Sequence, residues 1–352
     1  MVLALHFGPR IVPEADSSFL FLRRIPPFWL EGVDLFFVLS GFLISGILVD
    51  VRKSPRYFTT FYARRIFRIF PLYYVVLLGY GLAIILGHAD STTWLFESPL
   101  PYWSYVLYVQ NFAMASANSF GPWWMAASWS LAIEEQFYLT LPAIIRRVND
   151  RGLFRLAILG LAAAPILRAL IQRFKFLPGL ANYVLLPTRV DALAVGVLVM
   201  LLWRHRGPWL RIHRNRIAWG TFGAVLAWTL YPYLPNPHAI RLAFVNYTIN
   251  GLVFGAILLS LLIFPMSAAG RLLSTRFMRN LGNMAYSTYL FHPILLCVVF
   301  RVLRSKDPVL TDLADLVPVA VAAMITFGLA WISWSQFESR LLRIGHKFHY
   351  HN

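Results

Sequence analysis

The sequence predicts an all-α integral membrane protein, a polytopic bundle of about ten transmembrane helices. Of its 352 residues, 59% are hydrophobic and only 13% are charged. The mean hydropathy of +0.62 is too high for a soluble fold, because so many apolar residues cannot share one core beneath a hydrated surface. The chain is therefore expected to lie in a lipid bilayer.

Nine apolar runs are each long enough to cross a bilayer, which takes about 20 residues. The stretch 1–6 (MVLALH) is similar to the end of one more helix, so we expect the first transmembrane helix to be truncated in this chain. The nine complete runs are 32–49, 69–86, 125–145, 153–171, 183–203, 217–234, 244–264, 281–303 and 313–337.

Lysine and arginine residues predict how these helices are oriented. If segment 50–68 is cytoplasmic, 21 of the 32 basic residues fall on the cytoplasmic side, as the positive-inside rule requires. The net charge of +17 is therefore a signal of topology. Because the basic residues lie at helix ends and not along one face, no nucleic-acid partner is expected.

Nothing in the sequence predicts a second domain. There is no internal repeat and no low-complexity linker, so we interpret 1–352 as a single transmembrane domain with no appended soluble domain. The one cysteine, Cys297, cannot form an intrachain disulfide. No metal site is predicted, since the closely spaced histidines 346, 349 and 351 belong to a short polar tail.

Arginine residues cluster in the run YARRIFR, from Tyr62 to Arg68. Arg65 and Arg68 are three residues apart, and Arg64 and Arg68 four apart, so both pairs share a helix face. Guanidinium groups bind phosphate oxygens in a bidentate manner, which suits a nucleotide-bearing cosubstrate such as an acyl-CoA. Topology anchoring, or contact with lipid headgroups, is the alternative interpretation.

Glu134 and Glu135 lie near the middle of a predicted span, in SWSLAIEEQFYL. Adjacent helical residues point about 100° apart, so we expect only one of them to face a polar cavity. A buried carboxylate needs a cation or a hydrogen-bond donor. An ion pair that fixes helix register is the alternative, and for a second charged pair, Arg189 and Asp191, this structural interpretation is preferred.

Three histidines lie in or near the predicted spans, and imidazole is well suited to proton transfer near neutral pH. His6 is followed at once by Gly and Pro, which end a helix and can open it to water, although packing is the alternative role. His88 lies at an outer boundary. His292 precedes Pro293, whose missing N–H frees a carbonyl one turn back, so a role at a helix kink is expected.

Six motifs, in order along nearly the whole chain, resemble those of the membrane acyltransferase-3 family. They are GVDLFFVLSGFLI (32–44), FYARRIFRIFPLY (61–73), WSLAIEEQFYL (129–139), RVDALAVG (189–196), LGNMAYSTYLFHPILL (281–296) and FESRLL (337–342). The resemblance implies a multi-pass O-acyltransferase of the bacterial inner membrane. Such an enzyme moves an acyl group, usually acetyl, from cytoplasmic acyl-CoA to a hydroxyl of a glycan or lipid-linked saccharide.

The resemblance also implies roles for individual residues. His6 matches the essential histidine of the first span, Arg65 and Arg68 match an Arg-x-x-Arg motif, and Glu134 or Glu135 matches an acidic position. An arginine that precedes this histidine in the family would lie before Met1, so we expect the true start to lie upstream. Acyl-CoA would be a cosubstrate, with no cofactor bound permanently, and His6 would act as general base or carry the acyl group covalently.

A transporter or exporter of a lipid-linked or polar substrate is the alternative class of function. In such a protein the same buried charges would form a proton relay or line a substrate path. Many transporters contain two related halves, and no such internal symmetry is visible in this sequence. The arginine pair occurs at only one side of the predicted bundle, and this also favours the acyltransferase.

Overall fold

The computed structural model describes residues 31–87, 93–233 and 244–350, and these residues form helices and no strand. Seven helical segments are long and apolar enough to cross a membrane. A polytopic all-helical membrane protein is therefore confirmed. The truncated first helix that we predict lies outside the described residues.

Each of the nine predicted apolar runs coincides with a helix. Two of these helices are less typical of a membrane crossing: α12 (Arg214–Leu230) has only 17 residues, and α8 (Trp129–Arg147) contains Glu134, Glu135 and two arginines. The largest difference in bounds is in α4 (Tyr57–Ile85), which begins well before the predicted start at 69. The arginines interrupt the apolar run there but not the helix.

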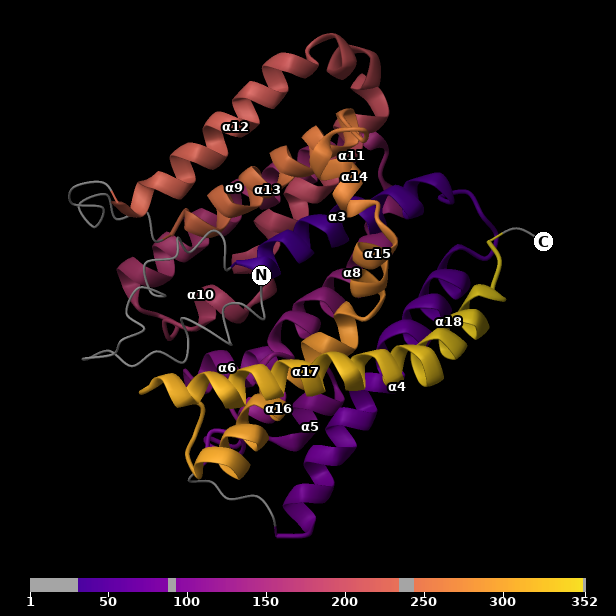
Figure 1. The fold of residues 1–352 in the computed structure, drawn as a ribbon. Coiled ribbons are helices and arrows are strands. Elements are labelled where there is room, and N and C mark those ends of the chain that lie inside the picture. The colour runs from indigo at the N-terminus through magenta and orange to yellow at the C-terminus, as the bar shows by residue number, and fades with distance from the viewer. Residues whose placement is uncertain (1–30, 88–92, 234–243, 351–352) are drawn as a thin grey trace. The chain divides into compact units, whose positions relative to one another are not determined.

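The described residues fall into two compact units, and each is described here by itself. The second unit comprises the described residues of Pro26–Arg52 and Ile133–Met278. At its centre α11 (Leu186–Ile212) packs against α3 (Gly32–Asp50), α9 (Asp150–Phe174) and α13 (Asn246–Ile263) (Figure 1). Around these helices lie α12, the single turn α10 (Ala181–Val184), a 3₁₀ turn (Tyr231–Tyr233) and α14 (Ala268–Leu273).

Two glycines allow α3 and α11 to approach closely. A methyl group at Gly41 would overlap the carbonyl oxygen of Leu193, and one at Gly196 would lie 2.9 Å from the Gly41 Cα. Small residues of this kind let the backbones of membrane helices come into contact, where dispersion forces act over many atoms. This crossing holds the buried start of α3 against the start of α11.

The first unit comprises the described residues of Lys53–Ala132 and Arg279–Asn352. Its long helix α4 packs against α18 (Ser339–His346), and α16 (Ala285–Arg304) packs against α17 (Leu316–Ser333). A π-helical segment, Trp334–Glu338, joins α17 to α18 in one continuous rod (Figure 1). Shorter helices complete the unit: α5 (Tyr102–Val106), α6 (Gln110–Ala117), α7 (Trp123–Ala126), the 3₁₀ turn Leu313–Asp315 and most of α15 (Arg276–Asn283).

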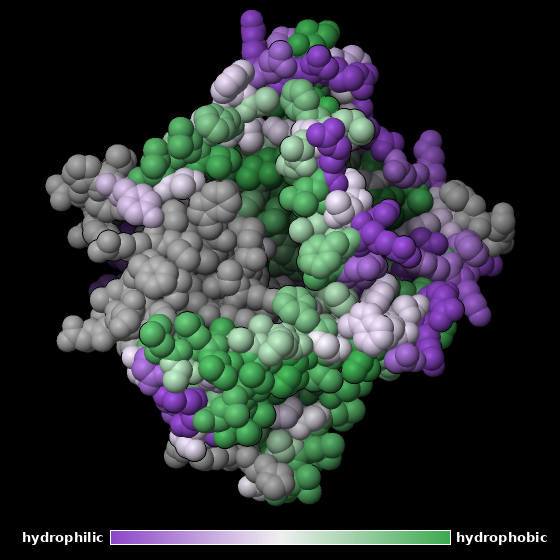
Figure 2. Space-filling view, viewed as in Figure 1, coloured by the Kyte–Doolittle hydropathy of each residue, from purple (hydrophilic) through white to green (hydrophobic). Residues whose placement is uncertain are grey.

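The outer surface of α17 is apolar. Val317, Met324 and Trp331 are each about 60% exposed, at 59%, 66% and 62%, and Figure 2 shows a continuous apolar face over this helix. Exposing large apolar side chains of this kind to water would be unfavourable, whereas contact with lipid tails is favourable. The exposed apolar surface therefore supports the membrane assignment independently of helix length.

Candidate active site

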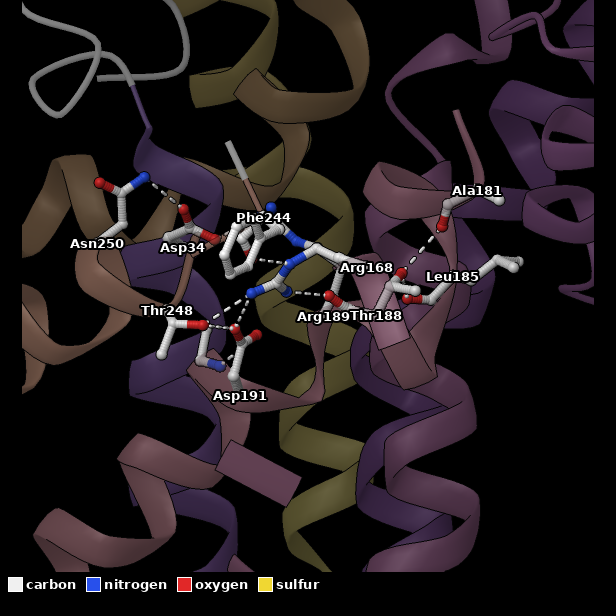
Figure 3. A network of polar contacts seen from close by, with 11 residues as sticks. Asp34, Arg168, Ala181, Leu185, Thr188, Arg189, Asp191, Phe244, Thr248 and Asn250 are labelled. Carbon is white, nitrogen blue, oxygen red and sulfur yellow. Dashed lines mark hydrogen bonds and ion pairs between the residues drawn. The ribbon is translucent and has the colours of Figure 1, made fainter. Parts of the chain in front are cut away.

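Two ion pairs lie in the interior of the second unit, where the first residues of α3, α11 and α13 meet α9. Arg189 donates a hydrogen bond to Asp34, and Arg168 donates to Asp191 at 2.8 Å. All four side chains are fully buried. The pairs thus connect three helices, α3, α9 and α11, inside an apolar bundle (Figure 3).

Neutral polar groups extend this network. Thr248, from α13, donates to Asp191 at 2.6 Å, and Asn250, from the same helix, donates to Asp34 at 3.0 Å. The Arg189 guanidinium also lies 3.9 Å from the ring centroid of Tyr247. Buried charges are tolerated only when they are paired and hydrogen-bonded in this way.

The interpretation of Arg189 and Asp191 as partners is wrong, although a structural role for both is supported. Two residues along a helix correspond to a rotation of about 200°, so these side chains point to opposite sides of α11. Each finds its partner on another helix, Asp34 for Arg189 and Arg168 for Asp191. Spacing along one helix could show that the charges were inside the bundle, but not which helix faced them.

Glu134 and Glu135 differ in their surroundings, as their adjacent positions on α8 predict. Glu134 is only 4% exposed and accepts hydrogen bonds from Ser40 at 2.6 Å and from Tyr138, one turn further along α8. Glu135 is half-buried. Glu134 is therefore the carboxylate that the second unit holds in a defined position, between α8 and α3.

The arginines of α4 lie in the first unit and have different environments. Arg64 donates to the Phe348 carbonyl from both Nε, at 3.1 Å, and Nη2, at 2.8 Å, and its guanidinium lies over the Tyr350 ring. The segment after α18 therefore holds Arg64 in place. Arg65 is half-buried with its guanidinium 6.0 Å from the Phe61 ring centroid, and Arg68 is exposed.

The same tail segment makes two more hydrogen bonds to the start of the first unit. Ser54 donates to the Tyr350 carbonyl, and Thr60 donates to the His349 carbonyl at 2.9 Å. The tail therefore lies along the first turns of α4. Its hydrogen bonds to that helix extend as far as Arg64, and the centroid of the Phe348 ring lies 6.0 Å from that of the Phe67 ring. Arg65 and Arg68, which we predict to bind phosphate, follow Arg64 on the same helix.

His292 performs the structural role that Pro293 predicts. Its Nδ1 lies 2.8 Å from the Tyr289 carbonyl oxygen, the acceptor that the missing N–H of Pro293 leaves without its helical donor. Nδ1 must carry the proton to donate this bond, which fixes the tautomer. The Tyr289 hydroxyl in turn lies 2.6 Å from that of Ser130 and donates to the Ala127 carbonyl at 2.8 Å.

The predicted site residues are distributed over separate parts of the chain. His6, the predicted base, and His88 lie outside the described residues. Arg65 and Arg68 belong to the first unit, and Glu134 and Glu135 to the second. The roles that we predict for all of these residues remain predictions.

Sequence reasoning missed Asp34 and Arg168 as parts of the buried network. Asp34 has a visible signal, because it is the one acidic residue inside the apolar run 32–49. Arg168 lies five residues before Arg173, the next basic residue of α9, and its position in the sequence suggests only a charge near a helix end. A charge one or two turns inside an apolar run is itself a sign of a buried partner.

The apolar helices with paired charges between them define a multi-pass membrane protein. Residues 1–335 match the acyltransferase-domain family (acyltransferase-3), and the chain belongs to this family. The family predicted from the six motifs is thus confirmed, and with it the class of enzyme, a membrane acyltransferase.

Curated relatives agree with this assignment. The peptidoglycan O-acetyltransferase OatA of Listeria monocytogenes is 27% identical over 304 residues, which cover 79% of this chain and 46% of that protein. The O-acetyltransferase OatA of Staphylococcus aureus is 23% identical over 364 residues, covering 91% and 57%. YrhL of Bacillus subtilis, provisionally named a peptidoglycan O-acetyltransferase, is 28% identical over 342 residues, covering 87% and 49%.

The chain spans about half the length of the curated relatives that it matches. No solved structure matches it.

Proposed function

We propose that this protein is an O-acetyltransferase of the inner membrane that moves an acetyl group from cytoplasmic acetyl-CoA to a hydroxyl of peptidoglycan or a related glycan. The observation that carries the proposal is the match of almost the whole chain to the acyltransferase family. The names of the relatives supply the acceptor class. The transporter alternative has no comparable support.

The donor would bind at the cytoplasmic part of α4. Arg65 and Arg68 are three residues apart on this helix, so both guanidinium groups can face one phosphate-bearing ligand. Arg64 donates two hydrogen bonds to the Phe348 carbonyl, so its guanidinium is already bound by the tail. The negative phosphates of acetyl-CoA would meet two forked donors at the predicted cytoplasmic surface, while the thioester reaches into the bundle.

His6 would act as general base in the transfer. It takes the proton of the acceptor hydroxyl, whose oxygen then forms a bond to the thioester carbonyl carbon. The bond between that carbon and the CoA sulfur breaks, and the leaving thiolate takes the proton from the imidazolium. In the covalent variant, His6 itself carries the acetyl group between the two steps.

Glu134 would orient or electrostatically stabilise the imidazole. A base that is positioned by a buried carboxylate is the logic of a catalytic triad. Glu134 suits this role better than Glu135, because Ser40 and Tyr138 hold its carboxylate in one place.

The test is a donor assay on the full chain in lipid nanodiscs with radiolabelled acetyl-CoA. CoA release is expected from the wild type and to be lost in His6→Ala. Arg68→Ala should raise KM for acetyl-CoA by about 10- to 100-fold, the effect of losing a hydrogen bond to a charged group. Arg276→Ala, at an exposed arginine of α15, is the matched control and should behave as wild type.

Arg68→Lys separates phosphate binding from topology anchoring. Lysine keeps the positive charge that orients the helix but lacks the planar fork. If Arg68→Lys restores wild-type KM while Arg68→Ala does not, a single charge suffices and the bidentate model is wrong. If a folded wild-type protein neither binds nor consumes acetyl-CoA, the proposed function is wrong and the transporter becomes the better interpretation.

A further inference from the structure

A pocket opens in the second unit where α9 ends and the chain turns into α10. Its volume is about 520 Å³, within the range of roughly 300–1,000 Å³ that is usual for small-molecule sites. Neither the buried ion pairs nor Glu134 and Glu135 line it. The lining residues are Ile171, Gln172, Lys175, Phe176, Leu177, Pro178, Gly179 and Asn182.

The pocket contains a buried acceptor that lacks a donor. Asn182 is only 9% exposed, and among the residues that the structure describes its Oδ1 has no hydrogen-bond partner. A buried polar atom without a partner is unfavourable, so a ligand that satisfies it gains affinity. With the amide oriented in this way, the ligand must offer an O–H or N–H group, which a sugar does and a fully ionised phosphate does not.

The rest of the lining suits the same class of ligand. Gln172 and Lys175 add polar groups, and the exposed ring of Phe176 adds an apolar surface. A few convergent polar groups on a mainly apolar wall are typical of ligand pockets. A sugar ring can contact both parts of such a wall. The hydroxyl groups at its edge bind the polar side chains, and the C–H groups on its flat sides pack against the apolar ones.

The ion-pair network holds the pocket wall in place. Arg168 donates to the Thr188 carbonyl, and the Thr188 hydroxyl donates to the Ala181 carbonyl at 2.9 Å, next to Asn182 (Figure 3). On the other side, Lys175 ends α9 in the left-handed region, with φ at 51°, and its N–H donates to the Ile171 carbonyl at 2.8 Å. The pocket is thus preformed, which lowers the entropic cost of binding.

The distribution of basic residues places this pocket on the side of the membrane away from the cytoplasm. Arginines 146, 147, 151 and 155, which precede or begin α9, are on the cytoplasmic side, so the end of α9 is on the other. From these observations we infer that the pocket is an acceptor subsite, which binds one saccharide unit of an extracytoplasmic glycan. The inference rests on the proposed function and adds a position for its acceptor.

The experiment measures saccharide binding without any acyl donor. The probe is the β-1,4-linked tetramer of N-acetylglucosamine, which is titrated into the full chain in zwitterionic nanodiscs and followed by calorimetry. Wild type is expected to bind, and Asn182→Leu to weaken binding by about 10-fold or more. Phe176→Ala removes an exposed ring, cannot disturb the core, and should weaken binding as well. Lys53→Ala, at an exposed lysine outside the pocket, is the control and should bind as wild type.

Each result bears on one proposal separately. Saccharide binding that depends on Asn182 and Phe176 supports the subsite even if the donor assay fails. Acetyl-CoA turnover by a protein that does not bind the tetramer, or that binds it equally well in both variants, overturns the subsite and leaves the proposed function standing. Binding that inorganic phosphate or anionic lipid abolishes, and that only Lys175→Ala weakens, would also overturn it and indicate a headgroup site.

Discussion

Asp34→Asn tests whether the buried ion pairs hold the second unit together. Asp34 and Arg189 are both fully buried, and Asn250 donates to the same carboxylate. Replacing the carboxylate by an amide leaves the shape unchanged but removes the charge that compensates Arg189. Breaking one partner of a buried pair typically costs about 3–5 kcal/mol, because the remaining charge is left without a partner in a medium of low dielectric.

The double variant Asp34→Leu with Arg189→Met gives the reference. It removes both charges and keeps most of the volume, and replacements of this kind are often neutral or stabilising. The free energy of unfolding would be measured for wild type, Asp34→Asn and the double variant by titration from mild detergent into SDS, followed by far-ultraviolet circular dichroism. Asp34→Asn should lose about 3 kcal/mol or more, and the double variant much less.

Two results would refute this reasoning. If Asp34→Asn lowers the free energy of unfolding by less than about 1 kcal/mol, water or another group compensates Arg189. The ion pair would then not hold α3 and α11 together as the contacts imply. A double variant that is less stable than Asp34→Asn would mean that the charges contribute net stability beyond their mutual compensation.

Two further predictions concern the helix crossing and the buried carboxylate. Gly41→Ala should lower the free energy of unfolding by about 1–3 kcal/mol in the same SDS titration, because its methyl group would overlap the backbone of α11. Gly46→Ala, whose nearest neighbour would be the Met200 side chain at 3.6 Å, should be tolerated. Glu134→Gln should reduce acetyl transfer in the donor assay by up to about 10⁴-fold, the effect of replacing the orienting carboxylate of a catalytic triad, and by more than Glu135→Gln does.

Equal stability of Gly41→Ala and wild type would show that α3 and α11 can separate at no cost, contrary to the close contact of their backbones. A larger loss of activity in Glu135→Gln than in Glu134→Gln would reverse the assignment of the two carboxylates. In that case the hydrogen bonds from Ser40 and Tyr138 would have only a structural role.

Hydropathy predicted the positions of the helices well, because each crossing must satisfy its own backbone hydrogen bonds and present an apolar surface to lipid. It was least accurate where polar side chains occur inside a helix. The start of α4 was placed too late because of its arginines. The turn α7 and the start of α8 at Trp129 were merged into one predicted run from 125, since both segments are apolar.

The partners of the buried charges could not be predicted in the same way. A helical period shows which residues of one helix share a face, but not which helix lies opposite that face. The sequence showed that Arg189 and Asp191 were inside the membrane, and the structure shows that their partners are Asp34 and Arg168, on two different helices. The pocket beside Asn182 also has no sequence signal, since it arises from the way the turn after α9 folds back on the bundle.

The two groups of buried carboxylates in the second unit are suited to different tasks. Asp34 and Asp191 are each bound by a buried arginine and by a second donor from α13, so removing either negative charge would leave a buried arginine without its partner, at a cost of several kcal/mol. Glu134 is bound by hydroxyl groups, which can donate or accept and can therefore adjust as charge develops nearby. This difference is a physical reason to look for chemistry around Glu134 and for rigidity around the ion pairs. It also explains why the wall of the pocket at Asn182 depends on Arg168, because the buried hydrogen bonds from this arginine to Asp191 and to the Thr188 carbonyl provide a fixed support for a binding site.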